Sequence, residues 1–556
     1  FLMIKKMPSR NHMYQVFSFL IVLICLTAPV LSQEKSAEVD KIFSAFKPGE
    51  PGCSVAFSQN GKIVINQAYG SADLERDVAI TPTTVFDAGS VRKQFVAAAI
   101  LLLVDEGKLS LSDDVRKYIP ELPDYGHKIT IDHLLTHTSG IRDWQPLLNL
   151  AGGDPTAMTM ILRQRELNFK PGDEWSYSNS GYVLLPEIVK KVSGMPFSEF
   201  ARKRIFEPLG MKSTSHPEDP LYLIKNRAIA YSKEAVGWKM DMYLGNERGG
   251  AGGLFTTAVD LVTWNDALMG TKLGKFVTEK LKEPALLNNG RKLSYARGLN
   301  IELRRGRGGQ LVWHSGGAAG YSALAGHLPE NGLSVAIMCN QDGTARTAFA
   351  SRLFDLYLPA EPSSVESPAP SAGVVPPADL ASRAGTFFNE KTGEALRLAV
   401  NNNTLMIAGA GPLAPIAPFT ENRFRNLRPT LFFMSEAEFE LQFLTPDRIE
   451  LKTKDGIVAH YHRAQPWTPT ADELKALSGR YFSEELLATF EAKPGNGGLM
   501  VQANYGNIIE FKPVMRDMFQ VGQMLIRFHR DNAGSVTGLE YSNPLLRNVK
   551  FSRAGG

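Results

Sequence analysis

Ser90 and Lys93 stand three residues apart at the start of an apolar stretch, FDAGSVRKQFVAAAILLL, over residues 86–103. Serine is a poor nucleophile at neutral pH unless a base lies beside it. A lysine held in dry surroundings can lose its proton and act as that base. Residues three apart share one face of a helix. The pair therefore predicts a nucleophile and its base, with a helix-capping serine beside a solvent-facing lysine as the alternative.

A second polar segment carries Tyr177 and Asn179, two residues apart in a loop that follows a Pro-Gly turn. Both side chains can point into one cleft, and a tyrosine close to a lysine can shuttle protons. The alternative is an ordinary turn with a half-buried tyrosine. A third segment, HSGG at residues 314–317, ends a predicted strand, and its glycines would let a ligand approach the backbone closely.

Two pairs of histidines have spacings that metal ligands use. His133 and His137 are four residues apart, but no third ligand stands nearby and the TSG that follows breaks the helix. His460 and His462 alternate on one face of a predicted strand. We interpret the first pair as structural and the second as a surface or packing feature. No metal is therefore expected at either pair.

A sheet with helices packed against it must position the polar segments. Residues 52–70 predict a hairpin, because their polarity alternates and Asn60-Gly61 is a strong turn signal. After Ser90, apolar residues recur at helical spacing to about Asp105, which predicts a buried helix. Three more strands and one helix are expected at residues 311–321, 322–329, 332–339 and 345–358.

The chain has 556 residues, too many for one ordinary core. Pro359–Ala378 is rich in Pro, Ser and Ala and is predicted to be a linker. Beyond it, LASRAGTFF at residues 380–388 matches LKALSGRYF at residues 474–482, 94 residues later, and the two units end alike in YHRA and FSRA. Two repeats with short strands predict two antiparallel barrels or sandwiches, over residues 379–466 and 467–556.

The first 32 residues have the pattern of an export signal. Basic residues precede the apolar run VFSFLIVLICLT, and small residues follow it up to Ser32. The run is short for a membrane span, so cleavage and a periplasmic or secreted protein are expected. The alternative is a membrane anchor formed by an uncleaved signal.

Two cysteines follow that signal, Cys53 and Cys339, and both lie in predicted strands. In an exported protein they can pair in a disulfide, and two buried thiols are the alternative. The net charge is +4, with basic and acidic residues mixed along the chain, so no nucleic-acid partner is expected. The expected partner is a small-molecule or peptide substrate, and a homo-oligomer stays open.

The order and spacing of the three polar segments resemble the signature motifs of the serine β-lactamase and penicillin-recognising superfamily. The matching residues are Ser90-Val91-Arg92-Lys93, Tyr177-Ser178-Asn179 and His314-Ser315-Gly316. The flanking stretches HLLTHTSGI, PGDEWSYSNSGY and GGLFTTAVDL resemble the class C branch. The resemblance covers about residues 40–358. It implies a β-lactamase-like domain of the α+β/α/β class over residues 33–358, with an antiparallel sheet, flanking helices and a helical lobe.

The resemblance also implies a role for each matching residue. Ser90 would attack a carbonyl and become acylated, while Lys93 and Tyr177 would take its proton and pass it to the leaving group. Asn179 would hold Lys93 and the substrate amide. The oxyanion would lie between two backbone N–H groups, a pair of donors that commonly lowers a barrier by about 3–4 kcal/mol. The implied oxyanion- and substrate-binding residues are Ser90, Asn179, Ser315, Gly316 and Gly317. The mechanism that the resemblance implies needs no organic cofactor.

The third motif departs from class C β-lactamases, which carry Lys-Thr-Gly where this chain has His314. A mostly neutral histidine supplies less positive charge for a β-lactam carboxylate, so we count it with the catalytic residues but expect weak activity on β-lactams. Arg304 and Arg307 precede the motif and are candidates for the missing charge, with surface exposure as the alternative. His-x-Gly occurs in relatives that are D-aminopeptidases, D-alanyl-D-alanine carboxypeptidases and esterases.

A catalytic domain followed by two barrels resembles bacterial D-aminopeptidases, in which a barrel loop reaches the active-site mouth. Accessory lipocalin-like modules without catalytic contact are the alternative. We therefore expect an exported serine hydrolase that forms an acyl-enzyme and cleaves amides of small or D-amino acids. An esterase or a weak class C-like β-lactamase is the alternative among enzymes. Outside enzymes, the alternatives are a penicillin-binding sensor that acylates and stalls, or a binding scaffold.

Overall fold

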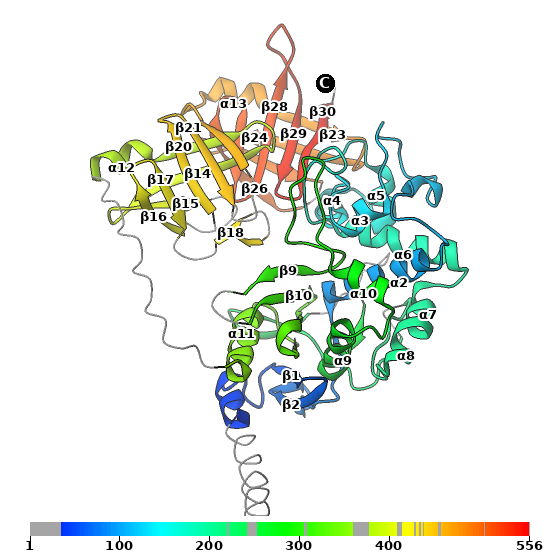
Figure 1. Ribbon diagram of the computed structural model, residues 1–556. Helices are drawn as coiled ribbons and strands as arrows, with labels where there is room; N and C mark the ends of the chain where they lie inside the picture. Colours follow the sequence, from blue (N-terminus) through cyan, green and yellow to red (C-terminus); the bar gives the residue numbers. More distant parts are fainter. Residues whose placement is uncertain are drawn as a thin grey trace, which may run out of the picture.

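The computed structural model describes residues 35–219, 222–241, 253–304, 308–359, 377–408, 414–426, 430–432, 435–437, 439–453, 458–504 and 506–554. An N-terminal region, residues 35–359, combines a sheet with helices, and two β-barrels follow it (Figure 1). Among the described residues, no helix has both the length and the apolar character that a membrane crossing requires. The predicted export signal and residues 360–376 of the predicted linker lie outside the described residues.

The N-terminal region is built on a six-stranded antiparallel sheet in the order β2-β1-β12-β11-β10-β9. The hairpin predicted over residues 52–70 is present, and its turn residues Asn60 and Gly61 have the positive φ values, 52° and 75°, that a tight hairpin turn requires. The strands predicted around the third polar segment are confirmed as well. The six strands are β1 (Cys53–Gln59), β2 (Lys62–Tyr69), β9 (Asn300–Leu303), β10 (Gln310–Ala318), β11 (Tyr321–Leu328) and β12 (Leu333–Cys339).

Helices cover both faces of this sheet. One face packs against residues 35–42 and against α11 (Arg346–Tyr357), which was expected at residues 345–358. The other face packs against α9 (Ala258–Met269) and joins the main core. Successive strand residues point to opposite faces, so Val55 enters the first of these cores and Ala56 the second.

The predicted helix after Ser90 is α2 (Lys93–Asp105), and it lies at the centre of the main core. Ten of its thirteen residues are buried, which is typical of a helix that is apolar all round. It packs against a helical lobe. The lobe contains α3 (Ile131–Leu135), α4 (Trp144–Leu150), α5 (Ala157–Arg163), α6 (Asn179–Ser193) and α7 (Phe197–Ala201).

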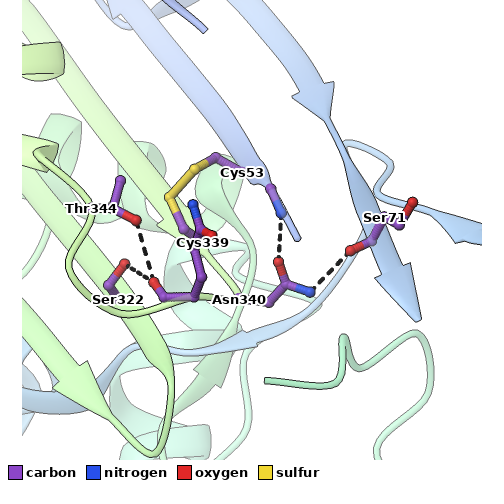
Figure 2. The surroundings of a disulfide bond; sticks show 8 residues. Cys53, Ser71, Ser322, Cys339, Asn340 and Thr344 are labelled. Atoms are coloured by element: carbon purple, nitrogen blue, oxygen red, sulfur yellow. Dashed lines mark hydrogen bonds between the residues drawn. A yellow bond between two sulfur atoms is a disulfide. The ribbon is translucent and has the colours of Figure 1, made fainter. Parts of the chain in front are cut away.

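Cys53 and Cys339 are joined in a disulfide, which decides between the two states that the sequence left open (Figure 2). They are directly opposite each other on the paired strands β1 and β12. The next residue, Asn340, accepts a hydrogen bond from the Gly52 N–H at 2.8 Å and donates one to the Ser71 carbonyl at 3.0 Å. The disulfide therefore lies at a buried, hydrogen-bonded end of two interior strands of the sheet.

Two closed eight-stranded antiparallel barrels follow, as the repeat predicted. The first contains β13 (Gly385–Asn389), β14 (Glu394–Asn401), β15 (Thr404–Ala408), β16 (Ala414–Thr420), β17 (Arg423–Asn426), β20 (Phe439–Thr445), β21 (Arg448–Thr453) and β22 (Val458–Arg463). The second contains β23 (Gly479–Ser483), β24 (Ala488–Pro494), β25 (Leu499–Ala503), β26 (Ile508–Met515), β27 (Met518–Val521), β28 (Met524–Arg530), β29 (Val536–Asn543) and β30 (Leu546–Arg553). The expected fold class is thereby confirmed.

The repeated sequence closes each barrel in the same way. A short helix, α12 (Pro377–Arg383) or α13 (Ala471–Leu477), leads into the first strand, which pairs with the last. The arginine shared by YHRA and FSRA then bonds the chain between that helix and that strand. Arg463 donates to the Ala384 carbonyl at 2.6 Å, and Arg553 donates to the Ser478 carbonyl at 2.7 Å.

Candidate active site

The structure brings Ser90 and Lys93 together at the start of the central helix. Ser90 lies in a single 3₁₀ turn, Gly89–Arg92, which runs directly into α2. Lys93 Nζ donates to Ser90 Oγ at 2.9 Å. The lysine is 2% exposed, and this burial, together with the positive charge of Arg92, lowers the pKa of Lys93 to about 7. A lysine with this pKa exchanges its proton near neutral pH, which is what a base for a serine needs.

Tyr177, in the loop before α6, and Asn179, the first residue of α6, reach the same two side chains. Tyr177 Oη donates to Ser90 Oγ at 2.9 Å, so Ser90 Oγ accepts hydrogen bonds from two donors. Asn179 Oδ1 accepts from Lys93 Nζ at 2.8 Å. Burial raises the pKa of Tyr177, while its bond to Ser90 acts in the opposite direction, so the phenol keeps its proton at neutral pH. Ser90, Lys93 and Tyr177 can therefore pass a proton among themselves, while Asn179 holds the lysine in place.

Strand β10 brings the backbone of the third segment against the turn that holds Ser90. Gly89 has a φ of 52°, and a Cβ there would lie 2.7 Å from the Gly317 nitrogen. A Cβ at Gly316 would lie 1.9 Å from the Ala88 carbonyl oxygen. Gly317 itself is exposed. Both close approaches require glycine, and they place the Gly317 backbone beside the Ser90 turn, where backbone N–H groups of both segments can bind a developing oxyanion.

His314 is buried behind this backbone and is neutral at physiological pH. Its Nδ1 donates to the Ser315 carbonyl at 2.5 Å, and its Nε2 accepts from Tyr295 Oη at 3.1 Å. Burial and the nearby charge of Lys93 lower the pKa of His314 to about 3. His314 therefore supplies no fixed positive charge. Ser315 is half-buried next to it.

Two residues that the sequence analysis did not select, Asp143 and Tyr295, support the site together with His137, which it interpreted as structural. Asp143 Oδ2 accepts from the backbone N–H and the side-chain amide of Asn179, both at 2.9 Å. His137 accepts from the Ser178 N–H at its Nδ1 and meets Tyr295 Oη at its Nε2, at 3.1 Å. The sequence offers a pattern that could have pointed to Asp143, because an aspartate before a helix is a common N-cap and Asp143 is the N-cap of α4. No such pattern points to Tyr295.

The remaining predicted features lie away from Ser90. His133 forms a capping box with Thr130 at the start of α3. His460 and His462 lie near Glu450 and Glu390 on the exposed side of β22. Arg304 was a candidate for the missing charge at His314, but it binds Ser351 and Asp355 of α11 instead, so that idea is wrong for this residue. Arg307 lies outside the described residues.

Comparison with known proteins gives consistent matches. The family model described as Beta-lactamase matches residues 39–357. A D-aminopeptidase of Brucella anthropi is 26% identical over 527 residues, which are 90% of this chain and 95% of that protein. A D-aminopeptidase of Brucella canis is 25% identical over 532 residues, 90% of this chain and 96% of that protein.

Two solved structures share the fold. The octameric penicillin-binding protein homologue from Pyrococcus abyssi has a TM-score of 0.52 and 24% identity, covering 77% of this chain and 99% of its own. SurE has a TM-score of 0.55 and 20% identity, covering 78% of this chain and 99% of its own. The family match extends over more than half of this chain and includes all three polar segments. The chain therefore belongs to the Beta-lactamase family and is a serine hydrolase of that fold.

Proposed function

We propose that this hydrolase cleaves amides of small or D-configured amino acids through an acyl group carried on Ser90. The observation that carries the proposal is the geometry at Ser90 Oγ, which accepts hydrogen bonds from Lys93 Nζ and Tyr177 Oη, both at 2.9 Å. A serine held between a lysine of lowered pKa and a tyrosine has both a base and a proton relay.

Each step of the proposed reaction has an assigned group. Neutral Lys93 takes the Ser90 proton while Oγ attacks the carbonyl carbon, and the oxyanion binds the N–H groups of Ser90 and Gly317. As the intermediate collapses, the C–N bond breaks and Tyr177 relays the proton from Lys93 to the leaving nitrogen. Water then attacks the ester on Ser90, which releases the acid and restores the serine. Asn179 keeps the lysine in place throughout.

The proposed substrate class follows from His314. Because this histidine is neutral, the strand beside the site offers no fixed cation for a substrate carboxylate. An amino-acid amide, or a peptide longer than a dipeptide cleaved after its N-terminal residue, has no carboxylate next to the scissile bond. The two relatives named D-aminopeptidase support this choice, because their similarity extends over 90% of the chain, barrels included.

The same acylation machinery also serves other substrates. An esterase would use identical residues, so an ester is the second candidate substrate. β-Lactams, and peptides cleaved next to their C-terminal carboxylate, are disfavoured by the neutral His314. A penicillin-binding sensor would acylate at Ser90 and then stall.

Three further features remain part of the proposal. We infer that residues 1–32 are an export signal, which makes the mature protein periplasmic or secreted. We also infer functional units over residues 33–358, 379–466 and 467–556. Whether this chain forms a homo-oligomer stays open, because the octameric state is that of the Pyrococcus abyssi homologue.

Turnover of D-alanine p-nitroanilide, L-alanine p-nitroanilide, p-nitrophenyl butyrate and nitrocefin, measured in parallel, tests the proposed function. We expect turnover of the D-anilide above the L-anilide and little turnover of nitrocefin, with Ser90→Ala inactive on all four. Ester turnover without amide cleavage would replace the amidase with an esterase. Activity retained in Ser90→Ala would refute the mechanism.

The pH profile of kcat/KM tests the role of Lys93. Only the neutral amine can take the serine proton, and the lowered pKa of Lys93 is about 7. We therefore expect kcat/KM to fall as the pH drops through about 7 and to level off above it. A profile that is flat between pH 6 and pH 8 would assign the base to another group.

A further inference from the structure

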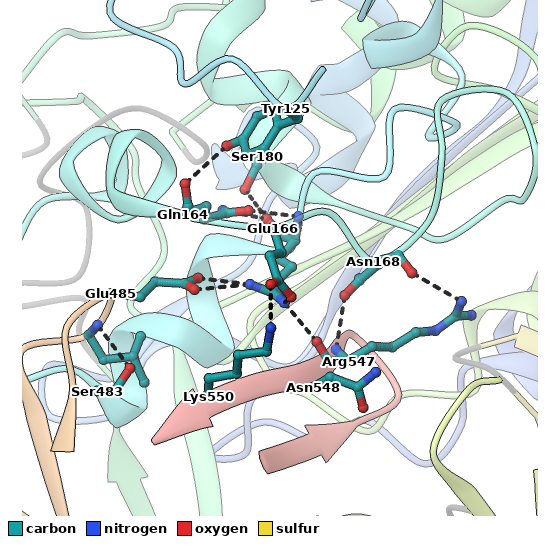
Figure 3. A network of polar contacts seen from close by, with 12 residues as sticks. Tyr125, Gln164, Glu166, Asn168, Ser180, Ser483, Glu485, Arg547, Asn548 and Lys550 are labelled. Carbon is teal, nitrogen blue, oxygen red and sulfur yellow. Dashed lines mark hydrogen bonds and ion pairs between the residues drawn. The ribbon is translucent and has the colours of Figure 1, made fainter. Parts of the chain in front are cut away.

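A buried ion pair joins the second barrel to the segment that follows His137. Arg142 lies in the N-terminal region, and Glu485 lies in the turn between β23 and β24 (Figure 3). Arg142 Nη1 donates to both carboxylate oxygens of Glu485 at 3.0 Å, and its Nη2 donates to the Arg547 carbonyl at 2.9 Å. The two side chains are 1% and 7% exposed. The guanidinium thus donates its hydrogen bonds to groups of the second barrel, and the Glu166 carboxylate of the N-terminal region lies 3.9 Å from its Nη2.

The backbone of Arg142 is fixed just as firmly on its other side. Its N–H donates to Gln164 Oε1 at 2.9 Å. Its carbonyl accepts from Gln164 Nε2 at 2.9 Å and from Ser180 Oγ at 2.7 Å. Ser180 follows Asn179 in the first turn of α6. Arg142 is therefore clamped between the second barrel and the start of the helix that carries Asn179.

This clamp sets the position of the next residue, Asp143. Asp143 is buried and accepts two hydrogen bonds from Asn179, one from its backbone and one from its side-chain amide. With its amide nitrogen held by Asp143, Asn179 turns its oxygen toward Lys93, at 2.8 Å. An unbroken series of contacts therefore leads from Glu485 in the barrel, through the Arg142–Asp143 peptide and Asn179, to Lys93.

We infer that Glu485 and Arg142 are positioning residues, through which the second barrel holds Asp143 and Asn179 in the arrangement that orients Lys93 toward Ser90. The inference rests on the proposed function, since it assigns Lys93 as the base. Neither residue contacts Ser90 in a described hydrogen bond, so neither is a catalytic residue. The second barrel is then a part of the active site's framework and not a separate accessory module.

Removing the Glu485 carboxylate would leave the buried guanidinium of Arg142 without its hydrogen-bonded anionic partner, with the Glu166 carboxylate 3.9 Å away. The Arg142–Asp143 segment would then shift to find new partners, and Asn179 would follow. Small displacements of a catalytic group cost rate more than substrate binding, because the group must be aligned with the reacting atoms. We expect kcat of Glu485→Ala to fall by about 10- to 100-fold, with KM changed by less than about threefold.

The experiment compares full-length variants on the ester and the D-anilide, with kcat normalised to the burst of p-nitrophenol that counts active sites. Glu485→Gln keeps the volume of the side chain and one hydrogen-bond acceptor, so we expect an intermediate loss of kcat. If Glu485→Ala does not fold, Glu485→Gln provides the test. Two variants serve as controls. Lys550→Ala removes another ion pair across the same junction, with Glu166, and Lys391→Ala removes the pair made by the equivalent position of the first barrel.

A graded loss of kcat from wild type to Glu485→Gln to Glu485→Ala, with both controls near wild type, supports the inference. Normal kcat per active site in Glu485→Ala, accompanied by a lower melting temperature, overturns it, because the pair would then serve stability alone. An equal loss in Lys550→Ala also overturns it. A wild type without Ser90-dependent turnover refutes the proposed function instead, and the inference with it.

Discussion

The two barrels begin with the same sequence unit but meet the N-terminal region in different ways. The matching units lie 94 residues apart, so Glu485 in the second barrel occupies the position of Lys391 in the first. Glu485 is buried against Arg142. Lys391 pairs with Glu174 at 2.8 Å, and its side chain is 74% exposed. One position in the repeat thus makes a buried junction in one copy and a surface ion pair in the other.

The hydrophobic cores of the two barrels also differ in how they join the N-terminal region. The core of the second barrel is continuous with the main core of the N-terminal region. The first barrel has a cluster of its own, and a smaller cluster that includes Phe388 and Met518 joins it to the second barrel. Figure 1 shows the second barrel next to the helical lobe of α3, α4 and α5.

This difference teaches that a duplicated fold need not carry a duplicated role. The strands and the closing arginines are shared, because they decide whether a barrel forms. The turn after the first strand is free to change in sequence, because its residues lie outside the wall and the core of the barrel. A glutamate there reaches the neighbourhood of Asn179, whereas a lysine there reaches only the loop before Tyr177.

The substitution Arg142→Met should produce the largest effect on stability. It leaves Glu485 as a buried charge without its partner, which typically costs about 3–5 kcal/mol. Urea unfolding of the full chain would measure the loss. The double variant Arg142→Met/Glu485→Leu removes both charges and should recover most of it. A loss below about 1 kcal/mol in the single variant would mean that the junction behaves like a surface pair.

Arg547→Ala should have an intermediate effect, because it removes a partly buried pair at the same junction. Arg547 Nη1 donates to Glu174 Oε2 at 3.0 Å, and hydrogen bonds to charged groups contribute about 1.5–3 kcal/mol. Burial would raise the pKa of Glu174, but Arg547 and Lys391 hold it below its ordinary value of 4.5.

That lowered pKa gives the variant a pH signature. A carboxylate with a depressed pKa contributes stability that is complete above its unfolded value and is lost as the pH falls through the folded value. Wild-type stability should therefore decline below pH 4.5 more steeply than that of Arg547→Ala. If the melting temperatures of the two proteins depended on pH in the same way, Arg547 would not be the cause of the lowered pKa of Glu174.

Lys391→Ala should have the smallest effect of the three. Its ion pair with Glu174 is solvent-exposed on the lysine side, and such pairs contribute about 0–1 kcal/mol. Activity and the urea midpoint should both stay close to wild type. A loss of stability as large as that of Arg547→Ala would mean that the junction of the first barrel stabilises the protein as much as that of the second, which would contradict this account.

Local patterns in the sequence predicted most of the fold and the central side chains of the candidate site. Ser90 and Lys93 could be paired because they are neighbours on one helical turn, and Asn60-Gly61 fixed the hairpin because two positive φ values are needed there. The repeat predicted two small antiparallel β domains, barrels or sandwiches, and the strand pairing shows that both are closed barrels. The roles of these residues in catalysis stay a proposal.

Contacts between distant segments outside the three motifs could not be predicted. Arg142 and Glu485 are 343 residues apart, and neither has a flanking motif that would reveal its partner. Tyr295 contacts both His137 and His314, but a lone tyrosine in a loop has no signal. The disulfide stayed open because it depends on the register of β1 against β12, which places Cys53 opposite Cys339.

The most direct test of the account is to locate the acyl group. The protein would be mixed with p-nitrophenyl butyrate, quenched in acid during the burst, digested and analysed by mass spectrometry. We predict a butyryl group on the peptide that contains Ser90, and no such peptide from Ser90→Ala. A butyryl group on any other residue, or full turnover with no covalent adduct in a rapidly quenched sample, would contradict the central claim that Ser90 is the nucleophile.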